Sequence, residues 1–350
     1  MALLGAAVFL TAFACSTPLS SSSGGDARGG TRSGTITESE VRRLLGALSD
    51  DSLEGRMTAS RGSARAAAII AAEMRRIGLE PAGDSGYFQR VPIALVDAGR
   101  GRRPVLLESF AQRDTLPAAQ RPPSVNVVGV LRGSDPAVRD SAVLIDAHYD
   151  HLGIGRPVNG DSIYNGFMDD ATGVAAVLTA AQALSDSARA GRLPRSVMLL
   201  LTTAEEAGSL GSAYYVSRPP VPLARTKATI TIDLPPPLAP PVRWVLEGND
   251  SALVRAAAAA VRPRGWRIEG APALPNSDHW SWIVRGVPSV FVVADEGWEG
   301  MTRAQEEALI AKWWHPHQPD DEWHESFPAA GLARQVELLV ALTSAYARRP

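Results

Sequence analysis

The chain has 350 residues, of which 45% are hydrophobic and 21% are charged, and its formal net charge is −2. These proportions are typical of a soluble globular protein and argue against disorder over most of the length. The near-neutral charge gives no strong positive field for nucleic acid. The single cysteine, Cys15, excludes a disulfide framework and a cysteine-based metal site within the chain.

The N-terminal residues carry an export pattern. Residues 2–14 form the only long uncharged apolar run, which is shorter than the roughly 20 residues of a membrane-spanning helix. The run has the length of a signal-peptide core and ends in the small-residue cleavage pattern Ala12-Phe13-Ala14. We therefore expect a signal peptide over 1–14 and a flexible Ser/Gly tether over 15–36. Because a cysteine follows the run directly, the pattern resembles a bacterial lipoprotein signal.

This resemblance implies an exported protein of the periplasm or cell envelope, anchored to the membrane by a lipid on Cys15. A soluble secreted protein cut after Ala14 is the alternative.

Apolar patterning predicts alternating helices and strands over the rest of the chain, residues 37–350. Helical spacing of apolar residues occurs at 37–48, 63–79, 172–184, 211–216, 251–261 and 331–346. Short, mainly apolar runs predict buried strands at 126–131, 143–147, 195–202, 229–232 and 287–293. Residues 94–122 give no clear assignment. Buried strands that alternate with helices predict an α/β fold with a mostly parallel, mixed central sheet covered by helices on both faces.

Acidic and imidazole side chains follow the predicted strands at the points where those strands end. Three strands lead directly into such residues: His148 and Asp150, Glu205 and Glu206, and Asp233. The segment 165–173 adds Asp169 and Asp170 just before a helix. All six histidines lie in or beside segments of this kind: His148, His151, His279, His315, His317 and His324. Because ligands bind at the carboxyl ends of parallel strands, we expect the chemistry there.

These residue types point to a metal site. Imidazole and carboxylate ligands without thiolate suit catalytic zinc, and two zinc ions about 3.5–4 Å apart need one carboxylate that bridges them. Three carboxylates and two neutral imidazoles leave two Zn²⁺ with about one excess positive charge, which a bridging hydroxide, the nucleophile of such sites, neutralises. A further carboxylate must stay off the metal to take the proton of the water. The adjacent pair Glu205 and Glu206 can supply both a metal ligand and a proton acceptor, because neighbouring side chains at a strand end diverge.

The motifs, taken in order, resemble the co-catalytic zinc aminopeptidase family, whose relatives include glutamate carboxypeptidases and glutaminyl cyclases. The resemblance covers about residues 40–345 and implies a zinc-exopeptidase (phosphorylase/hydrolase-like) architecture for a single catalytic domain over 37–350. Only about 45 residues, 94–138, separate the N-terminal helices from the first metal strand, too few for a protease-associated insert. The matching strings are LEGRMTASRGS (53–63), IDAHYDHLG (145–153), NGFMDDATGVAAVL (165–178), TTAEEAGSLGSAYY (202–215), ITIDL (230–234), NSDHWSW (276–282) and HQPDDEW (317–323).

The resemblance implies two zinc ions per chain, with Asp169 bridging them. The remaining ligands carried over from the family motifs are His148, Glu206, Asp233 and His317. His315 is the alternative to His317, but only His317 has the proline two residues on and the acid, Asp321, four residues on that the family shows, and we expect Asp321 to orient it. We expect His151 to be a loop residue or a support for the ligands.

The resemblance also assigns the catalytic roles and the reaction. Glu205 would be the general base and acid, and Asp150 would orient His148. The expected function is a zinc-dependent exopeptidase, foremost an aminopeptidase that releases N-terminal residues from peptide substrates. A carboxypeptidase or dipeptidase on the same site is the alternative, and glutaminyl cyclase fits less well because it would use a single zinc. The non-enzyme alternative is a binding protein that has kept the fold and lost the metals.

Overall fold

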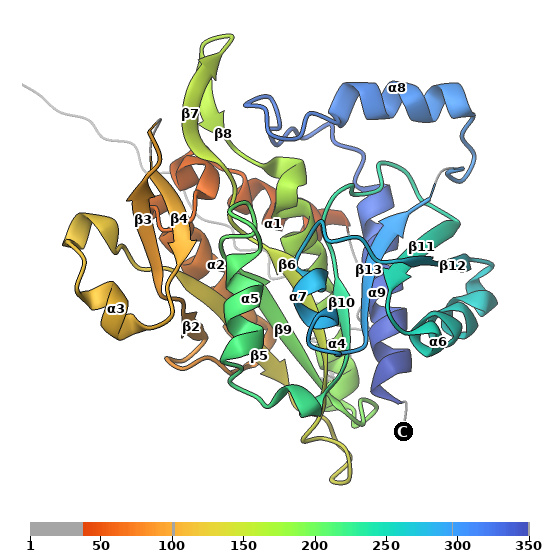
Figure 1. Cartoon of the computed structure of the whole chain (residues 1–350). Helices are drawn as coiled ribbons and strands as arrows, with labels where there is room; N and C mark the ends of the chain where they lie inside the picture. The colour runs from red at the N-terminus through yellow and green to blue at the C-terminus, as the bar shows by residue number, and fades with distance from the viewer. Residues whose placement is uncertain (1–37, 100–101, 296, 349–350) are drawn as a thin grey trace, which may run out of the picture. The chain divides into compact units, whose positions relative to one another are not determined.

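A mixed nine-stranded sheet lies at the centre of the structure, a computed structural model that describes residues 38–99, 102–295 and 297–348. The strand order is β1-β5-β9-β6-β10-β13-β11-β12, and β2 also pairs with β5 (Figure 1). Strands β9, β6, β10 and β13 are parallel, whereas β5 and β11 flank them in antiparallel orientation. The sheet strands are β1 Glu80–Pro81, β2 Phe88–Arg90, β5 Val125–Leu131, β6 Ala142–His148, β9 Ser196–Thr202, β10 Thr226–Thr231, β11 Arg243–Gly248, β12 Arg267–Pro272 and β13 Ser289–Ala294. The predicted α/β class with a mostly parallel, mixed sheet is confirmed.

The features predicted for the N-terminus lie outside the described residues. These are the signal peptide over 1–14, the tether over 15–36 and the lipid anchor at Cys15, and they stay predictions.

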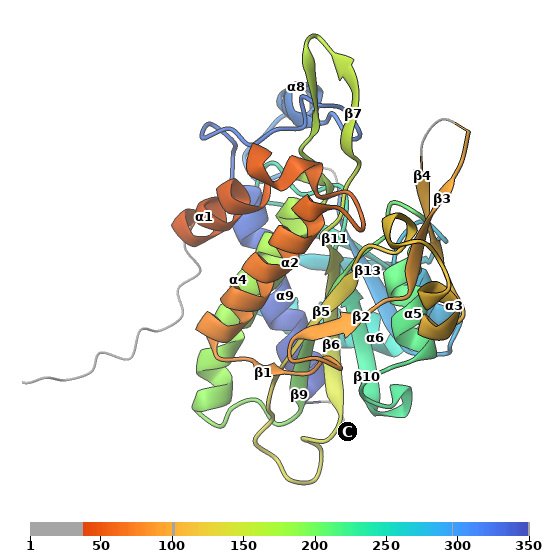
Figure 2. The same ribbon diagram turned by 90° about the vertical axis from the view of Figure 1, so that its left-hand side faces the viewer.

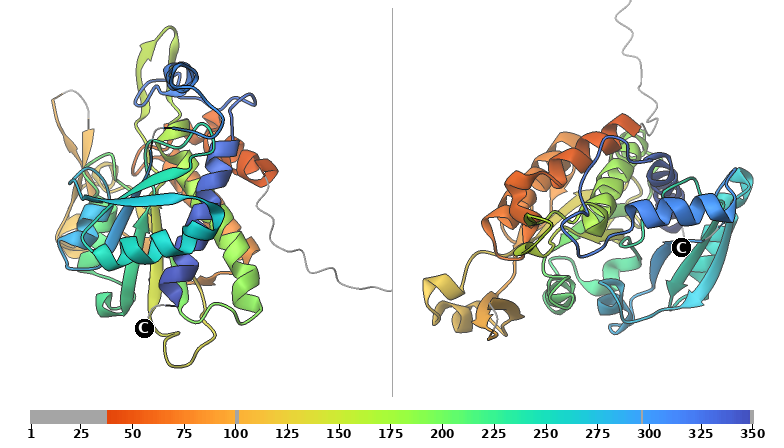
Figure 3. Two further views of the ribbon diagram at one scale, coloured as in Figure 1. Left: turned by 90° about the vertical axis from the view of Figure 1, so that its right-hand side faces the viewer. Right: turned by 90° about the horizontal axis from the view of Figure 1, so that it is seen from above.

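Helices cover both faces of the sheet. The larger layer contains α1 Glu38–Leu48, α2 Arg61–Ile77, α4 Thr172–Arg189, α6 Ser251–Val261 and α9 Ala330–Ala347. The opposite face carries α5 Leu210–Ser217 and α7 His279–Ile283. In Figure 2 the strands lie between α5 on one side and α2 and α4 on the other, and Figure 3 shows α6 beside α9 at the β11–β12 end. No helix within the described ranges is long and apolar enough to cross a membrane.

The central strands are apolar on both faces because both faces are covered. Every residue of β6 is buried. Val143 and Ile145 pack into the core under the larger helix layer, whereas Leu144, between them, packs into the smaller core with Trp282 of α7. Side chains alternate in this way along any strand, so a strand between two helix layers needs apolar residues at successive positions.

The helix predicted at 63–79 shows how local signals set its ends. It runs over Arg61–Ile77, with the hydroxyl of Ser60 accepting a hydrogen bond from the Ser63 N–H at 3.0 Å. It stops at Gly78, whose φ of 94° is a left-handed conformation that glycine adopts without steric cost.

Several elements escape the sequence patterns. The unassigned stretch 94–122 contains a two-stranded hairpin and a short helix, and a second hairpin and a polar helix project from the strand-end edge (Figure 1). They are β3 Ile93–Asp97, β4 Arg102–Leu106, α3 Phe110–Asp114, β7 Gly153–Val158, β8 Asp161–Tyr164 and α8 Arg303–Trp313. The remaining short helical turns are η1 Asp51–Arg56, η2 Ala118–Gln120, η3 Phe167–Ala171, η4 Leu223–Arg225 and η5 Arg262–Arg264. Apart from β3, these elements are largely exposed or half-buried, so core packing leaves little periodicity in them. The sheet strands β1, β2, β11 and β12 were not predicted either, and each has at most two buried residues.

A buried arginine, Arg56, binds three separate backbone segments to one another. Arg56 is 1% exposed, and its guanidinium donates to the carbonyl oxygens of Leu48 and Asn165 at 2.6 Å, of Tyr149 at 2.7 Å and of Gly166 at 2.8 Å. Four backbone acceptors within 2.8 Å, from three separate segments, thus share one side chain, and a fifth, the carbonyl oxygen of Asp169, lies at 3.5 Å. Buried carbonyl groups need such donors.

Replacing Arg56 by methionine should lower the free energy of unfolding by about 3–5 kcal/mol, because four buried acceptors lose their donor at once. Urea unfolding followed by circular dichroism measures the change. Arg65 is the matched control, because it is exposed and donates to a single carbonyl, that of Ser52. Arg65→Met should cost less than about 0.5 kcal/mol. Equal losses in the two variants would contradict this role of Arg56.

Candidate metal centre

The carboxyl ends of β6, β9 and β10 lie side by side, and their next residues meet. In register, Ala147 and His148 of β6 pair with Leu201 and Thr202 of β9. This is the edge of the sheet from which the β7–β8 hairpin projects in Figure 1. The structure brings the five predicted ligand side chains to this edge: His148, Asp169, Glu206, Asp233 and His317.

The first half of the cluster is centred on His148. Its Nε2 atom lies 3.1 Å from Oδ1 of Asp169 and 3.4 Å from Oδ1 of Asp233. Its Nδ1 atom lies 3.1 Å from the backbone oxygen of Asp150. A carbonyl oxygen can only accept, so this contact assigns the ring proton to Nδ1 and leaves Nε2 free to bind a cation.

The second half is centred on His317. Its Nε2 atom lies 3.0 Å from Oδ2 of Asp169 and 3.4 Å from Oε2 of Glu206. Asp169 therefore faces His148 with one carboxylate oxygen and His317 with the other. A carboxylate placed in this way between two imidazole groups has the geometry needed to bridge two metal ions. The peptide bond between Asp169 and Asp170 is cis.

Two further side chains also belong to the cluster. Nδ1 of His151 lies 2.6 Å from Oε1 of Glu206 and 3.7 Å from Oδ2 of Asp169. Ligand atoms lie within 4.8 Å of one another in two groups: His148, Asp170 and Asp233, and His151, Asp169 and Glu206. Asp170 and His151 were not among the predicted ligands. Their signals were the doubled acid in the segment 165–173 and the second histidine three residues after His148.

Orphaned buried atoms test whether these residues fit a cation. Among the described residues, both ring nitrogens of His151, Oε1 of Glu206 and Oδ2 of Asp170 are buried without a hydrogen-bond partner. The 2.6 Å contact of His151 with Glu206 is short, but its angles are not those of a hydrogen bond. Buried polar atoms without partners are rare in native proteins. Imidazole nitrogens and carboxylate oxygens together form a donor set found in catalytic zinc sites, so the residues fit the metal.

The buried acids of the cluster can carry more negative charge than the nearby histidines can balance. Burial raises the pKa of Asp170 well above its ordinary value, and nearby Asp233 and Asp169 add to the rise. Burial opposes ionisation of Asp169 too, yet the rings of His148 and His317 hold its pKa below the ordinary value. Without metal, the cluster must therefore bind protons in place of cations. Protons and metal ions compete for such ligands.

Glu205 stands beside the cluster. Its N–H donates to Oδ1 of Asp150 at 3.0 Å, and its Oε1 accepts from the Ser209 hydroxyl at 3.3 Å. Burial raises the pKa of Glu205 to about 9, and the nearby charges of Asp278 and Asp233 contribute. A carboxyl group held near a metal cluster with a raised pKa is suited to carrying a proton.

The contacts of Asp321 differ from those predicted. Its carboxylate accepts from the N–H of Met168 at 2.9 Å and of Asp169 at 3.4 Å. Within the described part of the chain, no hydrogen bond joins it to His317, so it fixes the turn that carries Asp169 instead of orienting the imidazole. Asp150, in contrast, does contact its predicted partner His148. Its backbone oxygen lies 3.1 Å and its Oδ1 atom 3.9 Å from Nδ1 of the ring, while its Oδ2 atom accepts a hydrogen bond from the hydroxyl of Thr58 at 2.7 Å.

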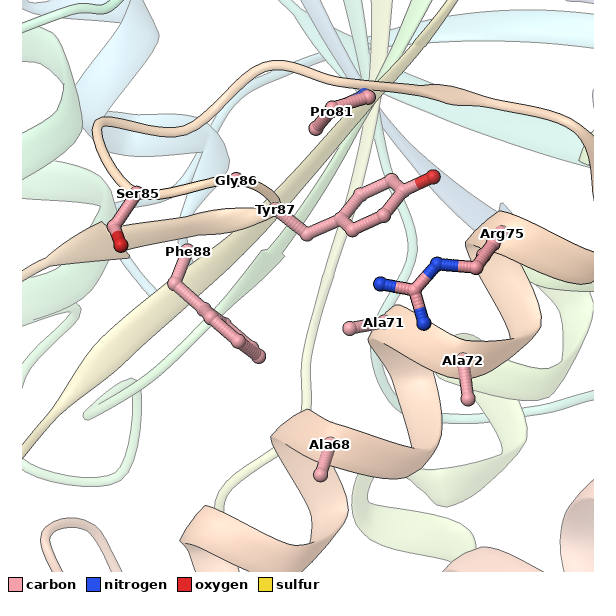
Figure 4. A pocket seen from close by; sticks show the side chains of 9 residues that line it. All are labelled: Ala68, Ala71, Ala72, Arg75, Pro81, Ser85, Gly86, Tyr87 and Phe88. Carbon is pink, nitrogen blue, oxygen red and sulfur yellow. The ribbon is translucent and has the colours of Figure 1, made fainter.

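A separate pocket of about 560 Å³ lies away from the cluster, between α2 and the strands β1 and β2 (Figure 4). Its only charged lining residue is Arg75, whose guanidinium carbon lies 5.7 Å from the ring centroid of Tyr87. Its lining residues include no acid and no histidine. We therefore place the chemistry at the strand ends.

A buried acid, Asp146, lies in β6 two residues before His148. Asp146 of β6 is fully buried and accepts hydrogen bonds from the Thr231 hydroxyl at 2.7 Å and from Nε1 of Trp282 at 2.8 Å. Burial raises the pKa of Asp146 to about 8, and the charge of Asp278 adds to the shift. In an unfolded chain the same group titrates near pH 4. The folded state thus holds a proton that the unfolded state releases. The stability from this group is full below about pH 4 and is lost as the pH rises through about 8.

Asp146→Asn should remove this pH dependence, because the neutral amide resembles the protonated acid. Relative to this variant, the wild-type protein should lose about 1.4 kcal/mol of stability per pH unit between about pH 5 and 8. Urea unfolding of both proteins in the presence of a chelator, at several pH values, measures the difference. Asp140→Asn, at an exposed position, is the control and should run parallel to wild type. A constant difference between wild type and Asp146→Asn would refute the expectation.

Comparison with known proteins gives one family and a set of similar folds. The model of peptidase family M28 matches residues 126–343. LapA aminopeptidase from Legionella pneumophila is similar with a TM-score of 0.58 at 16% identity, over 90% of this chain and 73% of that one. BSAP, a zinc aminopeptidase from Bacillus subtilis, gives 0.59 at 14% identity over 88% and 94%. Glutaminyl cyclase from Porphyromonas gingivalis gives 0.56 at 17% over 88% and 97%. A search of curated proteins finds no match.

Proposed function

Because this chain belongs to peptidase family M28, we propose that it is a zinc-dependent exopeptidase, specifically an aminopeptidase that releases N-terminal residues from peptides. The observation that carries the proposal is the placement of Asp169. Its two oxygens face His148 at 3.1 Å and His317 at 3.0 Å, so one carboxylate joins two imidazole-containing groups. Aminopeptidases are among the enzymes whose paired metals share such a site.

The cluster has ligands for two zinc ions. His148 and Asp233 would hold one ion, Glu206 and His317 the other, and Asp169 both. Three carboxylates leave two Zn²⁺ with about one positive charge, so the pair stays electrophilic. Zinc bound there supplies a Lewis acid that polarises the peptide carbonyl and lowers the pKa of a neighbouring water.

Glu205 acts as the general base and then as the general acid. Its carboxylate takes a proton from the attacking water and passes it to the nitrogen of the leaving amine. The hydrogen bonds from its N–H to Asp150 and from the Ser209 hydroxyl to its carboxylate hold it in place. Glu206, the next residue, turns toward His151 and His317, which leaves the two carboxylates with separate roles.

An apolar pocket beside the cluster supports a preference for large apolar side chains. It has a volume of about 210 Å³, and its walls include Met168, Pro235, Trp298, Ile310 and Trp314. Met168 directly precedes Asp169, and Pro235 comes two residues after Asp233, so the pocket adjoins the ligand carboxylates. Apolar cavities of about 150 Å³ already accommodate benzene. The pocket can therefore take an aromatic or branched aliphatic side chain.

Glu205→Gln tests the proposed chemistry. The variant should hydrolyse leucyl-p-nitroanilide at least about a hundredfold more slowly, because an amide cannot accept the proton of the water. It should still bind zinc, since Glu205 is not placed as a ligand. Glu206→Gln is the matched neighbour and should lose zinc together with activity. Near-normal turnover by Glu205→Gln would refute the assignment.

Zinc content tests the number of ions and the second imidazole. Metal analysis of the dialysed protein should give two zinc ions per chain, and His317→Ala should reduce this toward one. His151→Ala should keep two, because His317 lies closer to the shared Asp169 than His151 does. One zinc ion in the wild-type protein would contradict the paired site. Loss of zinc from His151→Ala but not from His317→Ala would make His151 the ligand.

A further inference from the structure

A second pocket opens beside the cluster, on the side of Glu206. Its volume is about 340 Å³, and both His151 and Glu206 line it. The opposite wall comes from the β3–β4 hairpin, which contributes Arg103 and Pro104. The pocket thus connects one half of the metal cluster to a hairpin whose residues precede the segment 126–343 matched by the family model.

Arg103 is the only arginine or lysine among the residues that line this pocket. It is exposed, and within the described part of the chain its side chain makes neither a hydrogen bond nor an ion pair. Its neighbour Arg102 is different, because it lies 3.4 Å from Asp97 and donates to the carbonyl oxygen of Ala119 at 2.9 Å. Successive residues of a strand point to opposite faces, which explains why only one of the two lines the pocket.

The other polar side chains of the pocket belong to the metal cluster or support it. Glu206 and His151 contact each other within the cluster, and the hydroxyl of Thr58 donates to Asp150. Arg103 is therefore the one permanently charged cation that lines the pocket outside the cluster. Its planar fork matches the two oxygens of a carboxylate.

We propose that Arg103 binds a carboxylate of the substrate on the leaving side of the scissile bond. This inference rests on the proposed function, because that function places the scissile bond at the cluster. The apolar pocket near Met168 then takes the side chain of the N-terminal residue, and the pocket with Arg103 takes the residue that is released as the amine. The substrate class is dipeptides, in which the terminal carboxylate belongs to that released residue.

An acidic side chain on the released residue offers the same chemistry, so the test separates the two sources. The zinc-loaded wild-type protein and Arg103→Met are assayed with Leu-Gly, Leu-Gly-amide and Leu-Glu-amide. The wild-type protein should favour Leu-Gly over its amide by about tenfold in kcat/KM, mainly through KM, as expected for one charge-assisted contact. Arg103→Met should lose that preference and hydrolyse Leu-Gly and Leu-Gly-amide with similar kcat/KM values.

A preference for Leu-Glu-amide over Leu-Gly-amide, lost in Arg103→Met, would assign the side-chain carboxylate instead of the terminal one. Added salt should weaken the preference in the wild-type protein and have little effect in the variant. Arg102→Met is the matched control and should keep the wild-type preference.

The proposal fails if the wild-type protein hydrolyses acid and amide substrates equally, or if Arg103→Met keeps the preference. If the wild-type protein hydrolyses none of the three peptides, the proposed function fails separately. Calorimetric binding of Leu-Gly and Leu-Gly-amide then decides the matter. Tighter binding of the acid that depends on Arg103 supports the carboxylate site, and equal binding overturns it.

Discussion

Buried negative charge at one edge of the sheet is the constraint on which the rest of the structure depends. Asp150, Asp169, Asp170 and Asp278 are each at most 2% exposed, and they come from three separate segments of the chain. Carboxylates are costly to bury unless cations or donors face them. Histidines meet part of this demand, and the donor set left over is one that zinc satisfies. The burial that makes the site costly also makes it a strong binder of cations.

One arginine and two buried carboxylates hold the backbone around this charge in place. Arg56 binds four carbonyl oxygens around the strand-end loops, Asp321 binds the turn before Asp169, and Asp150 binds the backbone of Glu205. Each of these groups fixes the backbone next to a reactive side chain. The ligands themselves are left with unpaired atoms, which is the arrangement a metal site requires. The two pockets beside the cluster differ in their lining. One is mainly apolar, and the other contains Arg103.

Sequence patterns predicted the parts of the fold that bury apolar surface. Apolar patterning identified the strands at 126–131 and 143–147, because both faces of the sheet are covered and need apolar residues. It also identified the helix at 63–79, whose buried face is apolar. The five side chains predicted as ligands come together at the strand-end edge, as their ordered motifs indicated, and their binding of metal stays a prediction. The β7–β8 hairpin was missed although Asn159 and Gly160 have positive φ values of 52° and 95°, a turn that the pair Asn-Gly favours. The roles of Asp321 and His151 depend on contacts between distant segments, and spacing along the chain does not encode such contacts.

The link between Asp321 and the turn at Met168 has a consequence for biosynthesis. The two residues are separated by 153 positions, and His317 comes equally late. A ribosome must therefore finish nearly all of the polypeptide before the turn is clamped and the last imidazole is available. A nascent or prematurely terminated chain carries the early acids without their late partners, so the cell is not exposed to a working hydrolase during translation.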